Sequence, residues 1–194
     1  MPTPDRRDLI ADAAISTVAD AGLRGLTHRA VDAAAGLPAG STSYYFRTRS
    51  ALIGACYLRL AELSVADADR WEADHGRPDL DSAAGALAAL LHHWLTAARD
   101  RQLARFELSL EATRRPELRA ALQTAGLAAR SRAASLLAAL GAPRPAPAAD
   151  LLVAWVDGLL YDRLVGALAA TRPPPDVAEL TAVARRMLDV ALST

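Results

Sequence analysis

The chain consists largely of residues that favour helices, and this bias constrains its fold more than any other feature. Alanine and leucine recur along the whole sequence, and all 22 basic residues are arginine, with no lysine and no asparagine. Alanine, leucine and arginine head the helix-propensity scale. Runs of β-branched and aromatic residues of strand length are missing. The sequence therefore predicts an all-α protein.

Length and composition exclude several classes of protein. A chain of 194 residues, 52% of them hydrophobic, is long enough to bury a core and too apolar to be a disordered tail. A single cysteine, Cys56, excludes a disulfide scaffold. No uninterrupted apolar run reaches the roughly 18 residues of a membrane span, and the start lacks the apolar core of a secretory signal. We expect a soluble, cytoplasmic protein that does not bind membranes.

Helix breakers and capping residues divide the chain into about nine helices, three short ones followed by six longer ones. The first follows a capping-box pattern at Asp5 and Asp8 and closes at Gly22 and Gly25. Thr27 and Thr48 are expected N-caps. Residues 141–147, which include three prolines, are expected to form a loop. The remaining helices are expected at about 27–35, 38–45, 48–73, 82–98, 101–114, 116–140, 149–170 and 176–192.

Positive charge is concentrated near the short helices although the whole chain is neutral. Residues 24–59 carry five arginines against one acidic residue, Asp32, a net charge of +4. A local basic patch is what binding to phosphate requires, and the overall charge is a poor guide when a larger neutral domain is attached.

The two short helices at 27–35 and 38–45, joined by a tight turn with glycine, have the outline of a helix-turn-helix. The second would be the recognition helix. A helix that enters the major groove, about 12 Å wide, must present small polar side chains rather than bulky apolar ones. Its candidate DNA contacts are Ser41, Thr42, Ser43, Tyr44 and Tyr45.

Residues 25–52 read GLTHRAVDAAAGLPAGSTSYYFRTRSAL, and this stretch resembles the DNA-binding domain of the TetR family of bacterial transcriptional regulators. The detailed resemblance covers about residues 5–60, and the rest agrees in length and helix count. It implies a three-helix DNA-binding domain at 1–47, connected by the helix 48–73, and a helical ligand-binding and dimerisation domain at 48–194.

The resemblance also implies roles for single residues. Thr27 and His28 match positions that contact phosphates, and Phe46 matches the aromatic residue that anchors the recognition helix. Arg49 stands where the family most often has a phosphate-facing lysine, and it keeps the charge. Many members carry tyrosine at the position of Ser43 and histidine at that of Tyr45, so the division of base and phosphate contacts within 41–45 stays open.

For the C-terminal part, the resemblance implies a dimer and a pocket. The late apolar helices would form a four-helix bundle with a second copy, and the helices between 60 and 140 would enclose a mostly apolar pocket with few polar groups. The predicted dimer interface comprises Leu152, Trp155, Leu159, Leu180, Val183, Met187 and Leu188. The predicted ligand-binding residues are Trp71, Trp94, Phe106, Leu110, Glu111 and Trp155.

The sequence is thus interpreted as a homodimeric repressor, not an enzyme, that leaves a pseudo-palindromic DNA operator when a small-molecule effector binds. It would act in the bacterial cytoplasm, at the nucleoid when bound to DNA, without a cofactor or a metal. One alternative is a helical-bundle enzyme, for which Glu72 and His75 have the spacing of a di-iron ligand pair but no second such pair exists. Another is a degenerate family member, independent of ligand, that acts through protein contacts.

Overall fold

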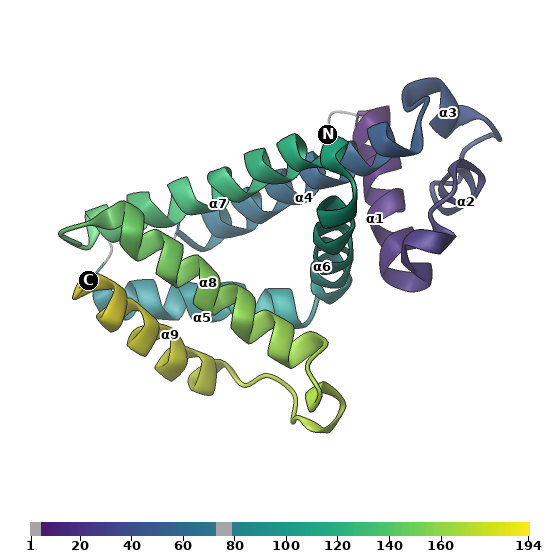
Figure 1. The fold of residues 1–194 in the computed structure, drawn as a ribbon. Helices are drawn as coiled ribbons and strands as arrows, with labels where there is room; N and C mark the ends of the chain where they lie inside the picture. Colours follow the sequence, from purple (N-terminus) through teal and green to yellow (C-terminus); the bar gives the residue numbers. More distant parts are fainter. Residues whose placement is uncertain (1–4, 73–78) are drawn as a thin grey trace. The chain divides into compact units, whose positions relative to one another are not determined.

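The computed structural model describes residues 5–72 and 79–194, without the side chains of residues 71 and 72. Within these residues it contains nine α-helices and two short 3₁₀ helices, and no strand (Figure 1). The all-α prediction is confirmed. None of the described helices combines the length and the apolarity that a membrane span requires. The α-helices are α1 (Arg6–Gly25), α2 (His28–Ala34), α3 (Ser41–Tyr45), α4 (Arg49–Glu72), α5 (Leu80–Leu95), α6 (Arg99–Arg114), α7 (Arg119–Ala139), α8 (Pro145–Leu164) and α9 (Val177–Leu192), and the 3₁₀ helices are η1 (Pro116–Leu118) and η2 (Ala169–Thr171).

Two compact units, each discontinuous in sequence, make up the chain. The first unit, called the head below, takes in the chain up to Glu62 and then Asp100–Ala125. The second unit, the body, takes in Leu63–Arg99 and Gly126–Thr194. The domain boundary at 47/48 concerns function and stays a prediction. The boundaries of the two compact units differ from 47/48. Residues of α6 belong to the head because they pack in the same core as α1, and α4 begins in the head and ends in the body.

The core of the head is formed by α1, α4 and α6, and the short helices pack on it. Ile10 and Val18 of α1 and Ile53 of α4 are fully buried, as is Leu108 of α6. Phe46, which directly follows α3, is buried in the same cluster. The anchoring role expected for Phe46 therefore agrees with its position.

In the body, α5, α8 and α9 pack on one another. The buried residues of α9 are Leu180, Ala184, Leu188 and Ala191, which recur every three or four residues and so form one face of the helix. The buried residues of α5 and α8 are mostly alanine and leucine as well. Small side chains allow these helices to approach closely.

Several helix boundaries differ from the predicted ones, most clearly those of α8. The helix begins at Pro145 because proline is tolerated in the first turn, where its missing N–H is not needed. It ends at Leu164 because the N–H groups of Val165 and Gly166 both bond back to the carbonyl of Tyr161. A Cβ at residue 166 would lie 2.5 Å from a backbone oxygen, so the turn requires glycine. The predicted range 149–170 was wrong at both ends.

The first helix also departs from its expected length. α1 has 20 residues and is not short, although Gly22 interrupts it with a φ of +66°. This kink lies where the glycine was expected to close the helix.

Candidate functional site

The turn between α2 and α3 is fixed by the carboxylate of Asp32. Its Oδ2 accepts a hydrogen bond from the N–H of Gly40 at 2.7 Å, and its Oδ1 accepts one from the N–H of Thr42 at 2.7 Å. Gly40 has a φ of +92°, a conformation that glycine adopts readily. Asp32 thus bridges the turn and the first residues of α3, a role that the sequence analysis missed.

The environment of Asp32 favours its ionised form. Its side chain is 4% exposed, and burial alone would raise its pKa. The hydrogen bonds from Thr42 and Gly40 outweigh burial, with a smaller contribution from His28, so the pKa of Asp32 is lowered. The carboxylate therefore carries its charge over the physiological pH range.

The other end of α3 is tied to α2 by His28. Its Nε2 donates to the carbonyl oxygen of Phe46 at 2.7 Å. Thr27 caps α2 as predicted, since its hydroxyl accepts from the N–H of Ala30 at 3.1 Å. Thr27 is exposed and its hydroxyl can still donate to a phosphate. The imidazole of His28, by contrast, holds α3 in place.

The structure separates the five candidate DNA contacts of α3 into exposed and buried ones. Tyr44 is 79% exposed and Ser43 is exposed beside it. Ser41 is half-buried and its hydroxyl donates to the carbonyl of Pro38. The ring of Tyr45 packs against the core and makes an edge contact with the ring of Tyr44, at 5.1 Å between centroids.

Thr42 does not fit its predicted role, and α3 is shorter than predicted. The Thr42 side chain is fully buried, so it belongs to the packing between α3 and the head. The helix begins at Ser41 rather than at residue 38, because the left-handed backbone of Gly40 precedes it. Only one face of α3 is therefore available to DNA.

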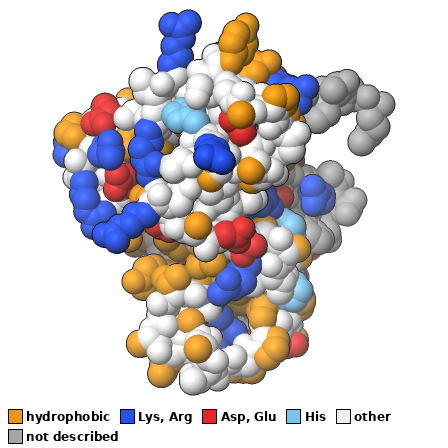
Figure 2. Space-filling model, turned by 90° about the vertical axis from the view of Figure 1, so that its right-hand side faces the viewer, with side chains coloured by type: hydrophobic (Ala, Val, Ile, Leu, Met, Phe, Trp, Pro, Cys, Tyr) orange, Lys and Arg blue, Asp and Glu red, His pale blue; other side chains and the backbone are white. Residues whose placement is uncertain are grey.

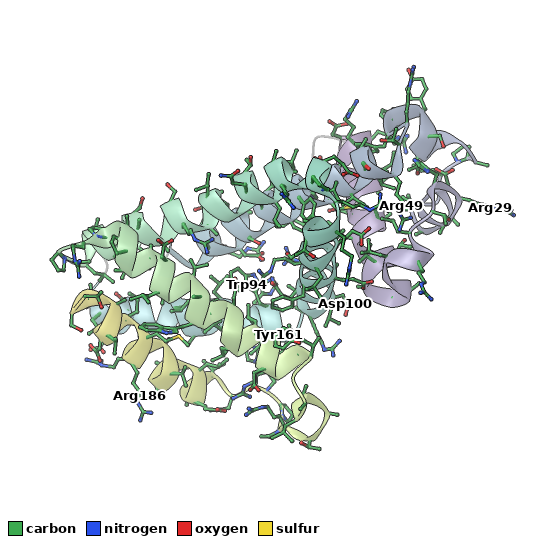
Figure 3. The ribbon with its side chains drawn as sticks, viewed as in Figure 1. Arg29, Arg49, Trp94, Asp100, Tyr161 and Arg186 are labelled. Atoms are coloured by element: carbon green, nitrogen blue, oxygen red, sulfur yellow. The ribbon has the colours of Figure 1, made fainter. Side chains whose placement is uncertain are left out.

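Arg49, at the start of α4, is tied to the end of α1. Its guanidinium, labelled in Figure 3, donates to the carbonyl oxygens of Leu23 in the last turn of α1 and of Leu26 directly after it. From α6, Glu107 Oε1 accepts from the N–H of Leu23 at 2.6 Å, and a Cβ on Gly22 would lie 3.0 Å from the same oxygen. Arg49 thus fixes the end of α1, a role that the sequence analysis missed, and its contact with phosphate stays a prediction.

Three arginines of residues 24–59 that the sequence analysis did not choose are exposed. Arg24, Arg29 and Arg47 are exposed in the head, and Arg29 extends outward from α2 in Figure 3. Figure 2 looks onto this end of the chain and shows arginine side chains on its surface. The charge excess of residues 24–59 indicated such a patch, but not which of its arginines face solvent.

Three of the predicted ligand-binding residues, Trp71, Trp94 and Trp155, belong to the body. The indole N–H of Trp94, on α5, donates to Oδ2 of Asp67 at 3.0 Å. Nε2 of His93 lies 3.4 Å from the other oxygen of Asp67, which is 4% exposed. Trp155 is half-buried on α8. The side chain of Trp71 lies outside the described residues.

The other three predicted ligand-binding residues, all on α6, lie in the head. Leu110 is 57% exposed, and Glu111 forms an ion pair with Arg115 at 2.5 Å. The ring of Phe106 is covered by the guanidinium of Arg105, with 4.5 Å between the Cζ atom and the ring centroid. Leu110 and Glu111 therefore have surroundings unlike those of an apolar pocket.

Of the predicted interface residues, three belong to the core of the body. Leu152, Leu180 and Leu188 are buried within the single chain, so they pack in its core and not on its surface. The prediction followed apolar character alone and ignored which face of the helix is buried. Trp155, Leu159, Val183 and Met187 are half-buried. The exposed large apolar residues of this region are Leu151, Tyr161, Val165, Leu168, Val177 and Val190.

Among the described side chains, no cluster of three or more His, Cys, Asp or Glu residues could hold a metal ion. His75 and the side chain of Glu72 lie outside the described part of the chain. Cys56 is fully buried in the head, and burial raises its pKa to about 12. Such a thiol is protonated and unreactive at neutral pH.

Comparisons with known proteins agree with this architecture. The family described as tetracyclin repressor-like, C-terminal domain, matches residues 78–191. A TetR-family member from Streptomyces coelicolor A3 is 33% identical, with 95% of this chain and 98% of that chain covered and a TM-score of 0.69. The multidrug-binding protein EbrR in complex with ethidium is 34% identical, with 95% and 98% covered and a TM-score of 0.67. None of the curated proteins matches the chain.

Proposed function

Because the chain belongs to the TetR family of transcriptional regulators, we propose that it is a homodimeric repressor that binds a DNA operator through α3 and leaves it when a small-molecule effector binds. Members of the family are transcription factors and not enzymes, and this protein is one of them. Its site of action is the nucleoid in the cytoplasm.

The observation that carries the proposal is the way α3 is presented. Asp32 bonds the start of this five-residue helix and His28 bonds the residue after it, while Tyr44 and Ser43 remain exposed. A recognition helix needs this combination, because its outer face must be free for base edges while its orientation stays fixed. The exposed Arg29 and Arg47 supply positive charge for phosphates on either side.

A second copy of the chain is the occupant we propose for the exposed apolar face of α8 and α9. Leu151, Tyr161 and Val190 are exposed there although they are large and apolar. Gly158, also exposed on α8, would allow the backbone of a second helix to come close. A two-fold dimer presents two copies of α3, which matches a pseudo-palindromic operator with half-sites about 34–36 Å apart.

The effector is proposed to bind in the body, near Asp67 and Trp94. A carboxylate beside an indole ring suits an aromatic cation, and EbrR is named as a multidrug-binding protein in complexes with ethidium, proflavin and malachite green. The helix α4 belongs to both units, so a tilt of α4 on binding would reach the head. The coupling expected for such regulators is about 1–3 kcal/mol, or about 5- to 150-fold in operator affinity.

The DNA-binding proposal is tested by selecting duplexes from a random library with the wild-type protein and measuring their affinity by fluorescence anisotropy from 50 to 300 mM salt. We expect the selected duplexes to contain inverted repeats and the affinity to fall steeply with salt. Sedimentation at the same protein concentrations should give the mass of a dimer. Failure to enrich any duplex, or a monomer that binds DNA, would contradict the proposal.

The effector proposal uses ethidium as the probe. Because ethidium also intercalates in DNA, its binding is first measured without DNA, by its fluorescence with wild-type and Asp67→Asn protein. We expect weaker binding to Asp67→Asn, since the carboxylate charge is lost. Release of the operator is then compared between the two proteins at equal ethidium. Equal ethidium affinity of the two proteins would remove Asp67 from the effector site.

A further inference from the structure

Arg7 is held beside the recognition helix by two aromatic rings. It lies in the first turn of α1 and is exposed. Its Cζ atom lies 5.3 Å from the centroid of the Phe46 ring and 5.9 Å from that of the Tyr45 ring. Contacts of a guanidinium with aromatic faces at these distances are favourable even at exposed sites. The side chain therefore has a preferred position, next to α3, before any ligand binds.

Arg7 and Arg59 both lie in the head but differ in whether a nearby carboxylate compensates their charge. Arg59 lies within 4 Å of three carboxylates, those of Asp8, Asp12 and Glu62, so its charge is compensated within the head. No carboxylate of the described residues forms such an ion pair with Arg7. Arg59 thus stabilises the fold, whereas Arg7 retains a net positive charge at the surface.

Contact with the rings at these distances leaves the N–H groups of the Arg7 guanidinium available to donate. These donors form a planar fork that matches two oxygens of a phosphate. The ring of Tyr45 contacts that of Tyr44, the most exposed large apolar residue of the described head, so the guanidinium beside Tyr45 lies near the outer face of α3. A duplex that meets Tyr44 would bring its backbone near Arg7.

We propose that Arg7 donates hydrogen bonds to a backbone phosphate of the duplex that α3 reads, and that Tyr45 and Phe46 are the platform that positions it. This inference rests on the proposed DNA-binding function. Tyr45 is then a positioning residue and does not read a base. Since a phosphate contact carries no sequence information, Arg7 contributes equally to every duplex.

The test compares Arg7→Gln with Arg6→Gln, which removes the same charge one residue earlier from a side chain that is also exposed. The probes are a 30-bp duplex selected by the wild-type protein and a random-sequence duplex of equal length. One lost phosphate contact should lower affinity by about eightfold at 0.1 M salt and reduce the salt slope by about 0.9, on both duplexes alike. Arg6→Gln should change both quantities less, and Arg7→Lys should keep most of the slope.

Two Tyr45 variants test the platform. Tyr45→Phe keeps the ring, so we expect wild-type affinity and specificity. Tyr45→Leu removes it, so affinity should fall on both duplexes, and combining it with Arg7→Gln should cost less than the sum of the two effects. Thermal unfolding of each variant separates loss of fold from loss of contact, because Arg7→Gln leaves the buried core intact.

Equal effects of Arg6→Gln and Arg7→Gln would overturn the inference, as would an Arg7→Gln loss confined to the selected duplex or a loss of specificity in Tyr45→Phe. If the wild-type protein binds both duplexes and Arg7→Gln does not weaken it, only this inference fails. If the wild-type protein binds neither duplex at low salt, the proposed function fails together with it.

Discussion

The head and the body are stabilised by different kinds of contact. In the body, helices of 16 and 20 residues pack through alanine and leucine, and charged pairs such as Arg130 with Asp150 lie at the surface. In the head, α2 has seven residues and α3 has five, too few to bury a long apolar stripe. Their positions depend on side chains that bond the backbone, above all Asp32 and His28.

The difference follows from what each unit has to leave exposed. A helix that reads DNA cannot cover its outer face, so it must be held from below and at its ends. The hydrogen bonds that Asp32 accepts and that His28 donates meet that need without covering Tyr44. The packing of α5, α8 and α9 in the body has no such requirement within one chain, and apolar contacts predominate there. We therefore expect the head to be sensitive to loss of polar groups and the body to loss of apolar volume.

The largest effect should come from Leu188→Ala in the body. Leu188 is fully buried in α9, and truncation of a buried leucine costs about 3 kcal/mol through lost burial and the cavity left behind. Urea unfolding followed by circular dichroism measures the change. Arg186→Ala, two residues away and exposed on the same helix, is the control and should change stability little. Similar losses in the two variants would contradict the assigned faces of α9.

Asp32→Ala should cost about 2 kcal/mol and abolish specific DNA binding. The variant leaves the N–H groups of Gly40 and Thr42 without their acceptor and frees the start of α3. Unfolding and anisotropy with a selected duplex measure the two effects. Asp81→Ala, which removes an exposed partner of Arg185 in the body, is the control and should leave both unchanged. Equal losses of stability and of DNA affinity in Asp32→Ala and Asp81→Ala would contradict the claim that polar groups position the short helices of the head.

The lowered pKa of Asp32 makes the free energy of unfolding depend on pH. The pKa of Asp32 is lower in the folded state than its unfolded value of about 3.9, so the unfolded state binds the proton more tightly. The contribution of Asp32 is therefore fully present well above pH 4 and is lost as pH falls through the folded pKa. The difference in stability between wild type and Asp32→Asn should therefore shrink as pH falls below about 4. A constant difference would show that ionisation of Asp32 does not matter.

The smallest effect is expected at Cys56, in the core of the head. Its buried thiol has a pKa of about 12, so a disulfide reagent at pH 8 should not label the folded protein. Labelling should appear only as the head unfolds in urea, at the rate of unfolding. Rapid labelling without urea would mean that the head opens more readily than its packing implies.

Features that depend on neighbouring residues in the sequence could be predicted, and features that depend on distant residues could not. Thr27 and Thr48 cap their helices as predicted, and Gly22 kinks α1, because caps and turns are local. The roles of Asp32 and Arg49 were not found, because each bonds a backbone segment that only the fold brings near. For charged residues the sequence predicted where the basic patch lies but not which side chains face solvent.

The same limit explains the errors in the body. The apolar residues of α8 and α9 were recognised, but the choice between core and dimer interface depends on which helix covers each face. Leu180 and Leu188 are covered by the chain itself, whereas Val190 is left exposed. Only the packed structure carries that information.

The central claim is that the exposed face of α3 reads DNA bases, and the ratio of affinities for a selected and a random duplex tests it most directly. Tyr44→Ala should lower this ratio at least about fivefold and leave the affinity for the random duplex nearly unchanged, since a lost base contact costs about 1–3 kcal/mol. An unchanged ratio for Tyr44→Ala, with wild-type affinity for the selected duplex, would contradict the account.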